Sequence, residues 1–163
     1  MDIFNSITSF LALIGLGLVF WQLRESIKDR HVEITMKFID SLGSEENRVL
    51  RKFIYNDLPQ NITDFTNEQI LKVEKVCNSF EQAALFGNRK FVDKDLLLSM
   101  YCVAIGWCWE ILYPWIENER KHLSNLHMIE FQQLAKDAQE YWRKHQPGEA
   151  FPPLPSQQDH KTE

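Results

Sequence analysis

Hydrophobic and polar positions divide the chain into an uncharged N-terminal run and a series of amphipathic segments. No charged residue interrupts the run from Ile3 to Leu23, and about 20 apolar residues suffice to cross a bilayer core as a helix. A cleaved signal peptide fits less well, because no basic residue precedes the run and no small-residue cleavage site follows it. The run predicts one membrane-spanning helix, with a buried helix of a soluble bundle as the alternative.

The helical period continues beyond this run. Positions on one helix face recur at steps of three and four residues, namely at Leu23, Ile27, His31, Ile34, Phe38 and Leu42. Gly43 then predicts the end of the helix. A continuous helix over residues 3–42 would be about 60 Å long at about 1.5 Å per residue. The pattern therefore predicts a transmembrane anchor over residues 1–23 and a helical stalk over residues 24–43.

The residues that flank and line the anchor predict its orientation and its packing. The basic residues lie on its C-terminal side, at Arg24, Lys28, Arg30 and Lys37. The positive-inside rule then places the following domain in the cytoplasm and the N-terminus outside. Small residues share one stripe of the anchor, at Thr8, Ala12 and Gly15. Such a stripe lets helices approach closely, so we expect a membrane-packing face and self-association.

Four further helical patterns predict a bundle over residues 44–146. Ser44 is a candidate N-cap for a short helix, and Thr66 with Gln69 forms a capping box before a longer one. Asp93 is a candidate N-cap of a fourth helix that extends to about residue 122, and a fifth covers about residues 124–145. The predicted fold class is all-α: an N-terminal transmembrane helix that continues into a stalk, plus a cytoplasmic bundle of about four helices.

The tail over residues 147–163 is polar and contains three prolines close together. This composition predicts a disordered tail. The segment Phe151-Pro-Pro-Leu-Pro155 leaves a short polyproline II ligand as the alternative.

The fourth helix is apolar enough to raise the possibility of a second membrane span. Glu110 is the single charged residue between Leu96 and Ile116. A central bundle helix, covered by neighbours on every side, is the favoured interpretation. Glu110 lies among tryptophans, so we expect it to be buried and paired. Its candidate partners are Arg120 across Pro114, Lys94, Arg89 or a basic residue of the first helix.

The sequence contains no catalytic, nucleotide-binding or metal-binding motif, so we expect no enzyme activity, no cofactor and no metal. Cys77, Cys102 and Cys108 lie within apolar helical patterns and are expected to be reduced core residues. The net charge of −5 argues against a general nucleic-acid binder. The basic turn of the third helix, with two residues of the fourth, forms a candidate ligand-binding set for a small anionic, cyclic nucleotide-like signal: Arg89, Lys90, Glu110 and Arg120.

Three stretches resemble a family of small bacterial membrane-anchored all-helical proteins of unknown function: residues 78–84, 92–97 and 109–120. The matching positions, which are helix-packing residues, are Phe80, Glu81, Asp93, Trp109, Glu110, Arg120, Phe131 and Leu134. Gln132 departs from the glutamate of that pattern. The resemblance covers about residues 5–140 and implies the architecture above, at a bacterial inner membrane, without an activity.

These features together predict a membrane-tethered sensing or interaction module, in a bacterial setting a stress or phage-defence effector that acts by oligomerisation. The expected partners are the lipid bilayer, further copies of the chain, and a protein or a small anionic ligand. Two alternatives remain open at this point. One is a channel- or transporter-like accessory with a second span at residues 96–116, and the other is a receptor for the anionic signal.

Overall fold

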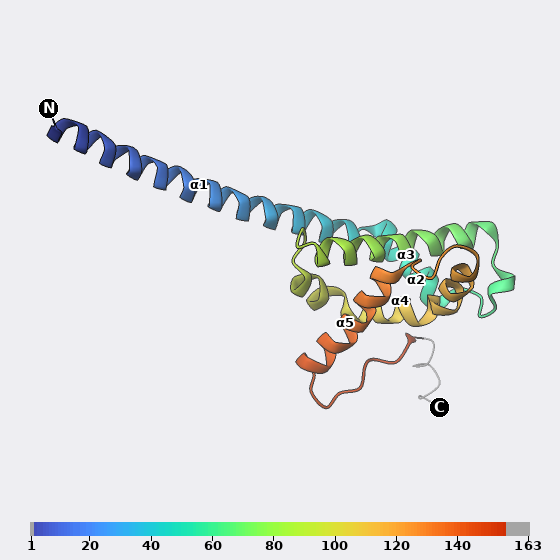
Figure 1. Cartoon of the computed structure of the whole chain (residues 1–163). Helices are drawn as coiled ribbons and strands as arrows, with labels where there is room; N and C mark the ends of the chain where they lie inside the picture. Colours follow the sequence, from blue (N-terminus) through green and yellow to red (C-terminus); the bar gives the residue numbers. More distant parts are fainter. Residues whose placement is uncertain (1, 156–163) are drawn as a thin grey trace.

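One long helix projects from a compact helical bundle (Figure 1). The computed structural model describes residues 2–155, and of these the side chains of all but residues 2–14, 27–29 and 31. The elements are α1 (Asp2–Leu42), α2 (Glu45–Asn56), the short 3-10 helix η1 (Ile62–Asp64), α3 (Asn67–Asn88), α4 (Lys94–His122) and α5 (Ile129–His145). No strand occurs among the described residues, so the predicted all-α fold class is confirmed.

Local capping interactions begin three of these helices where the sequence predicts. The Ser44 hydroxyl accepts a hydrogen bond from the backbone N–H of Asn47 at the start of α2. Thr66 and Gln69 form the reciprocal capping box at the start of α3. The Asp93 carboxylate accepts the backbone N–H of Leu96 at 3.0 Å. Each cap satisfies an N–H group that the first turn leaves without a helical partner.

The core of the bundle forms around α4, which contacts α2, α3 and α5. Its inward positions are fully buried and include Leu97, Ile105, Leu112 and Ile116, and Pro114 lies inside the continuous helix. The three cysteines are free and buried, as predicted. Burial raises the pKa of Cys108 to about 12, so this thiol stays protonated and unreactive at neutral pH.

Among the described residues, α4 is the one helix long and apolar enough to cross a membrane, with a mean hydropathy of 1.6 over its most apolar window. Its packing against three other helices accounts for that composition equally well. The side chains of residues 2–14, which form much of the uncharged N-terminal run, lie outside the described part of the structure. The finding for α4 therefore does not extend to that run.

The fifth helix begins later than the sequence predicts, at Ile129 instead of about Ser124. Residues 123–128 form turns, and the N-cap residue Met128 has a left-handed backbone (φ 55°) and no capping side chain. The cap comes from α3 instead. The Glu81 carboxylate accepts the backbone N–H of Phe131 at 2.6 Å and that of Glu130 at 3.4 Å. A negative charge at a helix N-terminus is favourable, so Glu81 both caps α5 and attaches it to α3.

Replacing Glu81 by alanine is expected to lower the free energy of unfolding by about 1.5–3 kcal/mol, because hydrogen bonds to a charged acceptor are lost. Glu81→Gln, which keeps an acceptor oxygen, is expected to lose less. Denaturant unfolding of the full chain measures both, with Glu74→Ala on the same helix as the control. Equal losses for Glu81→Ala and Glu74→Ala would show that the cap does not stabilise α5.

The tail differs from the expected disorder over residues 150–155, which lie against α4 and α5. The indole N–H of Trp107 donates to the carbonyl of Pro152 at 2.9 Å, and that of Trp142 donates to the carbonyl of Ala150 at 3.2 Å. Phe151 packs beside the Trp142 ring, with 5.8 Å between the centroids. These partners order a segment whose composition alone predicts a flexible end. Residues 156–163 lie outside the described part of the chain.

Candidate functional site

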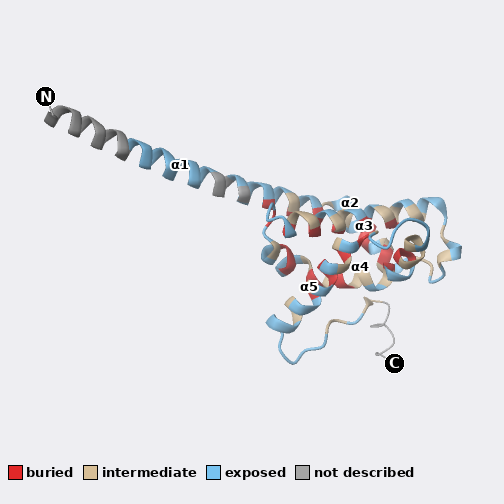
Figure 2. Cartoon of the chain, in the orientation of Figure 1, coloured by how far each residue is buried: buried red, intermediate tan, exposed pale blue. Residues whose placement is uncertain are grey.

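The C-terminal end of α1 packs against the bundle and connects the projecting helix to the rest of the domain. Along the described part of α1, side chains are exposed from Leu16 to Leu23 and become buried at Thr35, Ile39 and Leu42 (Figure 2). Phe38 adds an edge-to-face contact with Phe86 of α3, with 5.4 Å between the ring centroids. We call the residues that hold this end of α1 the socket: Thr35, Arg51, Tyr101 and loop residues 89–93.

Two socket side chains bind the last carbonyl groups of α1. The Arg51 guanidinium, which is buried, donates to the carbonyl of Leu42 at 2.8 Å. The Tyr101 hydroxyl donates to the carbonyl of Ile39 at 3.2 Å, and burial raises the pKa of this phenol, which keeps its proton at neutral pH. Arg51 also lies over the Tyr101 ring at 5.6 Å. A cation at a helix C-terminus complements the helix dipole, so this pair stabilises the end of α1.

Gly43 is needed here because of a close approach. A Cβ atom at this position would lie 2.9 Å from the Tyr101 hydroxyl oxygen. The residue after α1 must therefore lack a side chain for Tyr101 to reach the carbonyl of Ile39.

The other side of the socket is the loop between α3 and α4. The Thr35 hydroxyl oxygen accepts the backbone N–H of Asp93 at 3.2 Å. Lys90 in this loop has a left-handed backbone, with φ 59°, a conformation that costs a residue with a side chain about 1–2 kcal/mol. The loop thus bends sharply enough to bring Asp93 onto α1, and the Thr35 contact attaches α1 directly to the first turn of α4.

Replacing Thr35 by valine is expected to cost about 1–3 kcal/mol, because the shape is kept while the N–H of Asp93 loses its acceptor. Hydrogen exchange of the Asp93 amide is expected to become faster than in the unchanged chain. Thr35→Ser, which keeps the hydroxyl, is the matched control and should retain the protection. Unchanged exchange in the valine variant would mean that Thr35 does not hold the loop.

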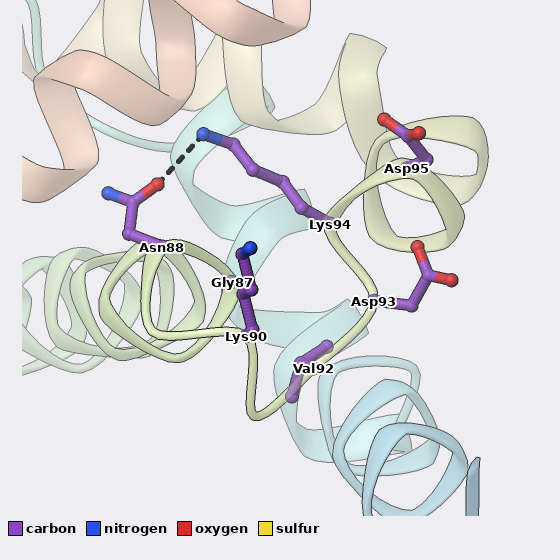
Figure 3. A pocket seen from close by; sticks show the side chains of 7 residues that line it. All are labelled: Gly87, Asn88, Lys90, Val92, Asp93, Lys94 and Asp95. Atoms are coloured by element: carbon purple, nitrogen blue, oxygen red, sulfur yellow. Dashed lines mark hydrogen bonds between the residues drawn. The ribbon is translucent and has the colours of Figure 1, made fainter. Parts of the chain in front are cut away.

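A cleft of about 460 Å³ opens beside the socket, between the end of α3 and the start of α4. Lys94 reaches across it and donates to the Asn88 side-chain carbonyl at 2.8 Å (Figure 3). The same amino group forms an ion pair with Asp137 of α5 at 2.6 Å. Lys90 and Lys94 line the cleft together with Asp93 and Asp95, so its formal charges balance. A balanced lining gives no particular preference for an anionic ligand.

The four predicted ligand-binding residues do not form one site. Lys90 lines the cleft, and Arg89 is exposed at the C-cap of α3. The prediction that Glu110 is buried is wrong, because its side chain is exposed on α4. Arg120 instead forms an ion pair with Glu117 at 2.8 Å.

The remaining donors of Arg120 hold the turn before α5. Its guanidinium donates to the carbonyl of His127 at 2.9 Å, to the Gln132 side chain at 3.0 Å and to the carbonyl of Met128 at 3.5 Å. Arg120 is therefore a structural residue that connects α4 to the start of α5.

The predicted membrane-packing face is described at one of its three positions. Gly15 has no atom within 4 Å of the place where a Cβ would lie, so α1 has open space around it there. The side chains of Thr8 and Ala12 lie outside the described residues.

Comparison with known protein families matches residues 9–138 to a domain of unknown function, DUF4760. The chain belongs to this family. No curated protein and no solved structure matches it. The DUF4760 match begins within α1 and ends within α5, so it contains the whole socket and the Glu81 cap. The expected resemblance to a family of unknown function is confirmed, whereas the bacterial inner membrane remains a prediction.

Sequence patterns identify few of the residues that form the socket of this DUF4760 domain. Thr35 and Tyr101 lie within apolar helical patterns, where a hydroxyl gives no sign of a distant partner. Arg51 has the appearance of a surface charge on a short amphipathic helix. Their roles depend on contacts with residues up to 62 positions away in the chain.

Proposed function

We propose that the chain is a membrane-tethered interaction module in which residues 3–23 cross the bilayer and the helical domain lies in the cytoplasm. The observation that carries the proposal is the continuous α1, 41 residues long, whose described apolar residues outside the domain have no protein cover. Phe20 is 75% exposed, Leu16 69% and Trp21 64%. Contiguous exposed apolar side chains mark a surface that contacts a membrane or another protein.

The socket supports a mechanical role for α1. Three hydrogen bonds hold its C-terminal end. Arg51 of α2 and Tyr101 of α4 donate to carbonyl groups of α1, and the loop before α4 donates to Thr35. A helix held in this way moves with the domain, so a change in the direction or spacing of anchors would be transmitted to the bundle, and the reverse. Self-association of the anchors would then be coupled to the arrangement of the domains. A role in bacterial stress or phage defence remains a prediction.

Labelling of single cysteines in the full chain tests the topology. Asp2→Cys precedes the proposed span, and Ser124→Cys lies on an exposed turn of the bundle. In intact cells an impermeant maleimide should label position 2, and position 124 only after the inner membrane is opened. The buried natural cysteines are expected to react slowly, because burial raises their pKa. Labelling of both positions from the same side would reject the proposed topology.

A third position separates this proposal from a second span at residues 96–116. Met100 is exposed on α4, so Met100→Cys should react together with position 124 once the inner membrane is opened. A span through α4 would instead shield position 100 within the lipid and leave it unlabelled from both sides. Chemical crosslinking of the same full chain in membranes measures the expected self-association.

A further inference from the structure

The ordered tail occupies a groove that has the chemistry of a peptide-binding site. Two tryptophans from different helices, Trp107 of α4 and Trp142 of α5, donate indole N–H bonds to carbonyl groups of residues 150 and 152. Aromatic grooves bind proline-rich segments in this way, because such segments keep accessible carbonyls and lose little conformational entropy on binding. Residues 150–154 are therefore bound in the groove as a ligand and belong to no helix.

Gly106 leaves the space in which the Phe151 ring is bound. An ideal Cβ on Gly106 would lie 2.4 Å from the ring carbon Cζ of Phe151. The three nearest atoms to this position all belong to Phe151, so the Phe151 ring fills the space directly above Gly106. Any side chain at position 106 would compete directly with Phe151.

Exposure along the segment follows a period of three. Phe151 and Leu154 are both half-buried, as are Pro152 and Pro155, whereas Pro153 is exposed. Polyproline II has three residues per turn, so positions three apart share one edge. Up to Leu154, before the helical residue Pro155, two edges of the segment thus face the groove and the third faces outward, the arrangement expected for a polyproline II ligand.

The groove continues beyond the bound residues. Leu154 lies at the edge of a cleft of about 390 Å³ formed by α2, α4 and residues 56–65. Tyr55 at this cleft stands edge-on to Trp107, with 5.5 Å between the centroids. The segment therefore occupies one end of a longer apolar surface.

A short hinge separates this ligand from the helix that carries it. The hinge covers residues 146–149 and contains Pro147 and Gly148, whose φ is +90°. It is closed by one backbone hydrogen bond, from Glu149 to Gln146 at 3.2 Å. Rotation about Gly148 would release residues 150–155 without disturbing α5.

We propose that the groove defined by Gly106, Trp107 and Trp142 binds residues 150–155 of a second copy of the chain in exchange for its own. The second copy carries the segment that the groove already fits, so each contact would be restored in the exchanged pair. Exchange of an identical element across a hinge is a low-cost route to a dimer. The exchanged dimer becomes populated where the local concentration of chains approaches the effective concentration of the tail at its own groove. For a short flexible linker that effective concentration is in the mM range. This proposal stands whether or not residues 3–23 cross a membrane.

Two complementary full-length variants test the exchange in detergent solution. Gly106→Leu fills the space that the Phe151 ring occupies and keeps the tail intact. Leucine also has a higher helix propensity than glycine. Phe151→Ser keeps the groove and disables the tail. The Gly106→Leu chain also carries Leu154→benzoylphenylalanine, a photocrosslinker, and the Phe151→Ser chain is labelled with heavy nitrogen. Mass spectrometry of the illuminated mixture is expected to find light tails joined to heavy residues around position 106, increasingly with protein concentration.

The control replaces the heavy partner by heavy Gly106→Leu, in which both grooves are blocked. The light–heavy product is expected to fall several-fold in this pair. Equal yields in the two mixtures would overturn the proposal, because contact would then not depend on the groove. A mixture of light and heavy chains with unchanged grooves and tails, each carrying the crosslinker, must also yield light–heavy products. Products confined to single copies at every concentration would show that the tail binds only its own groove.

Discussion

Replacing Leu16 by arginine is expected to shift the chain from the membrane to the soluble fraction by about a hundredfold, because the substitution raises the free energy of insertion by about 3 kcal/mol near the middle of a span. Leu16 lies well inside the uncharged run and is 69% exposed on α1. No contact with the domain would be lost. Fractionation and alkaline extraction of cell membranes measure the effect.

Val32 provides the matched control, because it is also an exposed apolar residue of α1. It lies in the stalk beyond Arg24, outside the proposed span. Val32→Arg is expected to leave membrane attachment unchanged. If both substitutions release the chain equally, the exposed face of α1 binds a protein partner along its length and the proposed anchor is wrong.

Phe131→Ala is expected to lower the free energy of unfolding by about 3–5 kcal/mol, the usual cost of a cavity left by a buried phenylalanine. Phe131 has no exposed surface. Its ring is stacked on Phe80 of α3 and lies edge-on to Trp109 of α4, with 5.2 Å between the centroids in both cases. One side chain of α5 thus holds two other helices, and its loss should loosen the contact between α5 and the bundle.

Ile129→Ala is the control, since Ile129 is in the same turn of α5 but is 41% exposed. It is expected to lose much less stability. Denaturant unfolding of the full chain, followed by circular dichroism, compares the two variants. A similar loss of stability in both variants would show that burial of the Phe131 ring is not what stabilises the contact between α5 and the bundle.

The helices whose ends were predicted well are those with short-range signals. Ser44, the Thr66–Gln69 box and Asp93 each bond to an N–H group three residues away. The start of α5 has no such signal, because its cap is Glu81, about 50 residues earlier in the chain. A cap supplied by another helix cannot be recognised from spacing along the sequence.

The residues of the candidate site also divide into those with a short-range sequence signal and those without one. Lys90 was recognised as part of a basic turn and does line the cleft. The aromatic neighbours of Glu110 in the sequence predict a buried position, yet its side chain is exposed. On a helix that is apolar nearly all round, periodicity does not indicate which face meets the core. The groove for residues 150–155 was missed because its two tryptophans and its glycine come from separate helices.

The sequence by itself determined that the secondary structure of the described residues is helical, that the first helix continues to Leu42, and where capped helices begin. These properties arise from hydrogen bonds and side-chain periods within about four residues. Only the tertiary structure decided which side chains hold α1, where α5 starts, which face of α4 is buried and where the tail lies. Those outcomes depend on partners brought close by packing, and the same residue types would serve equally well as surface or core until that packing exists.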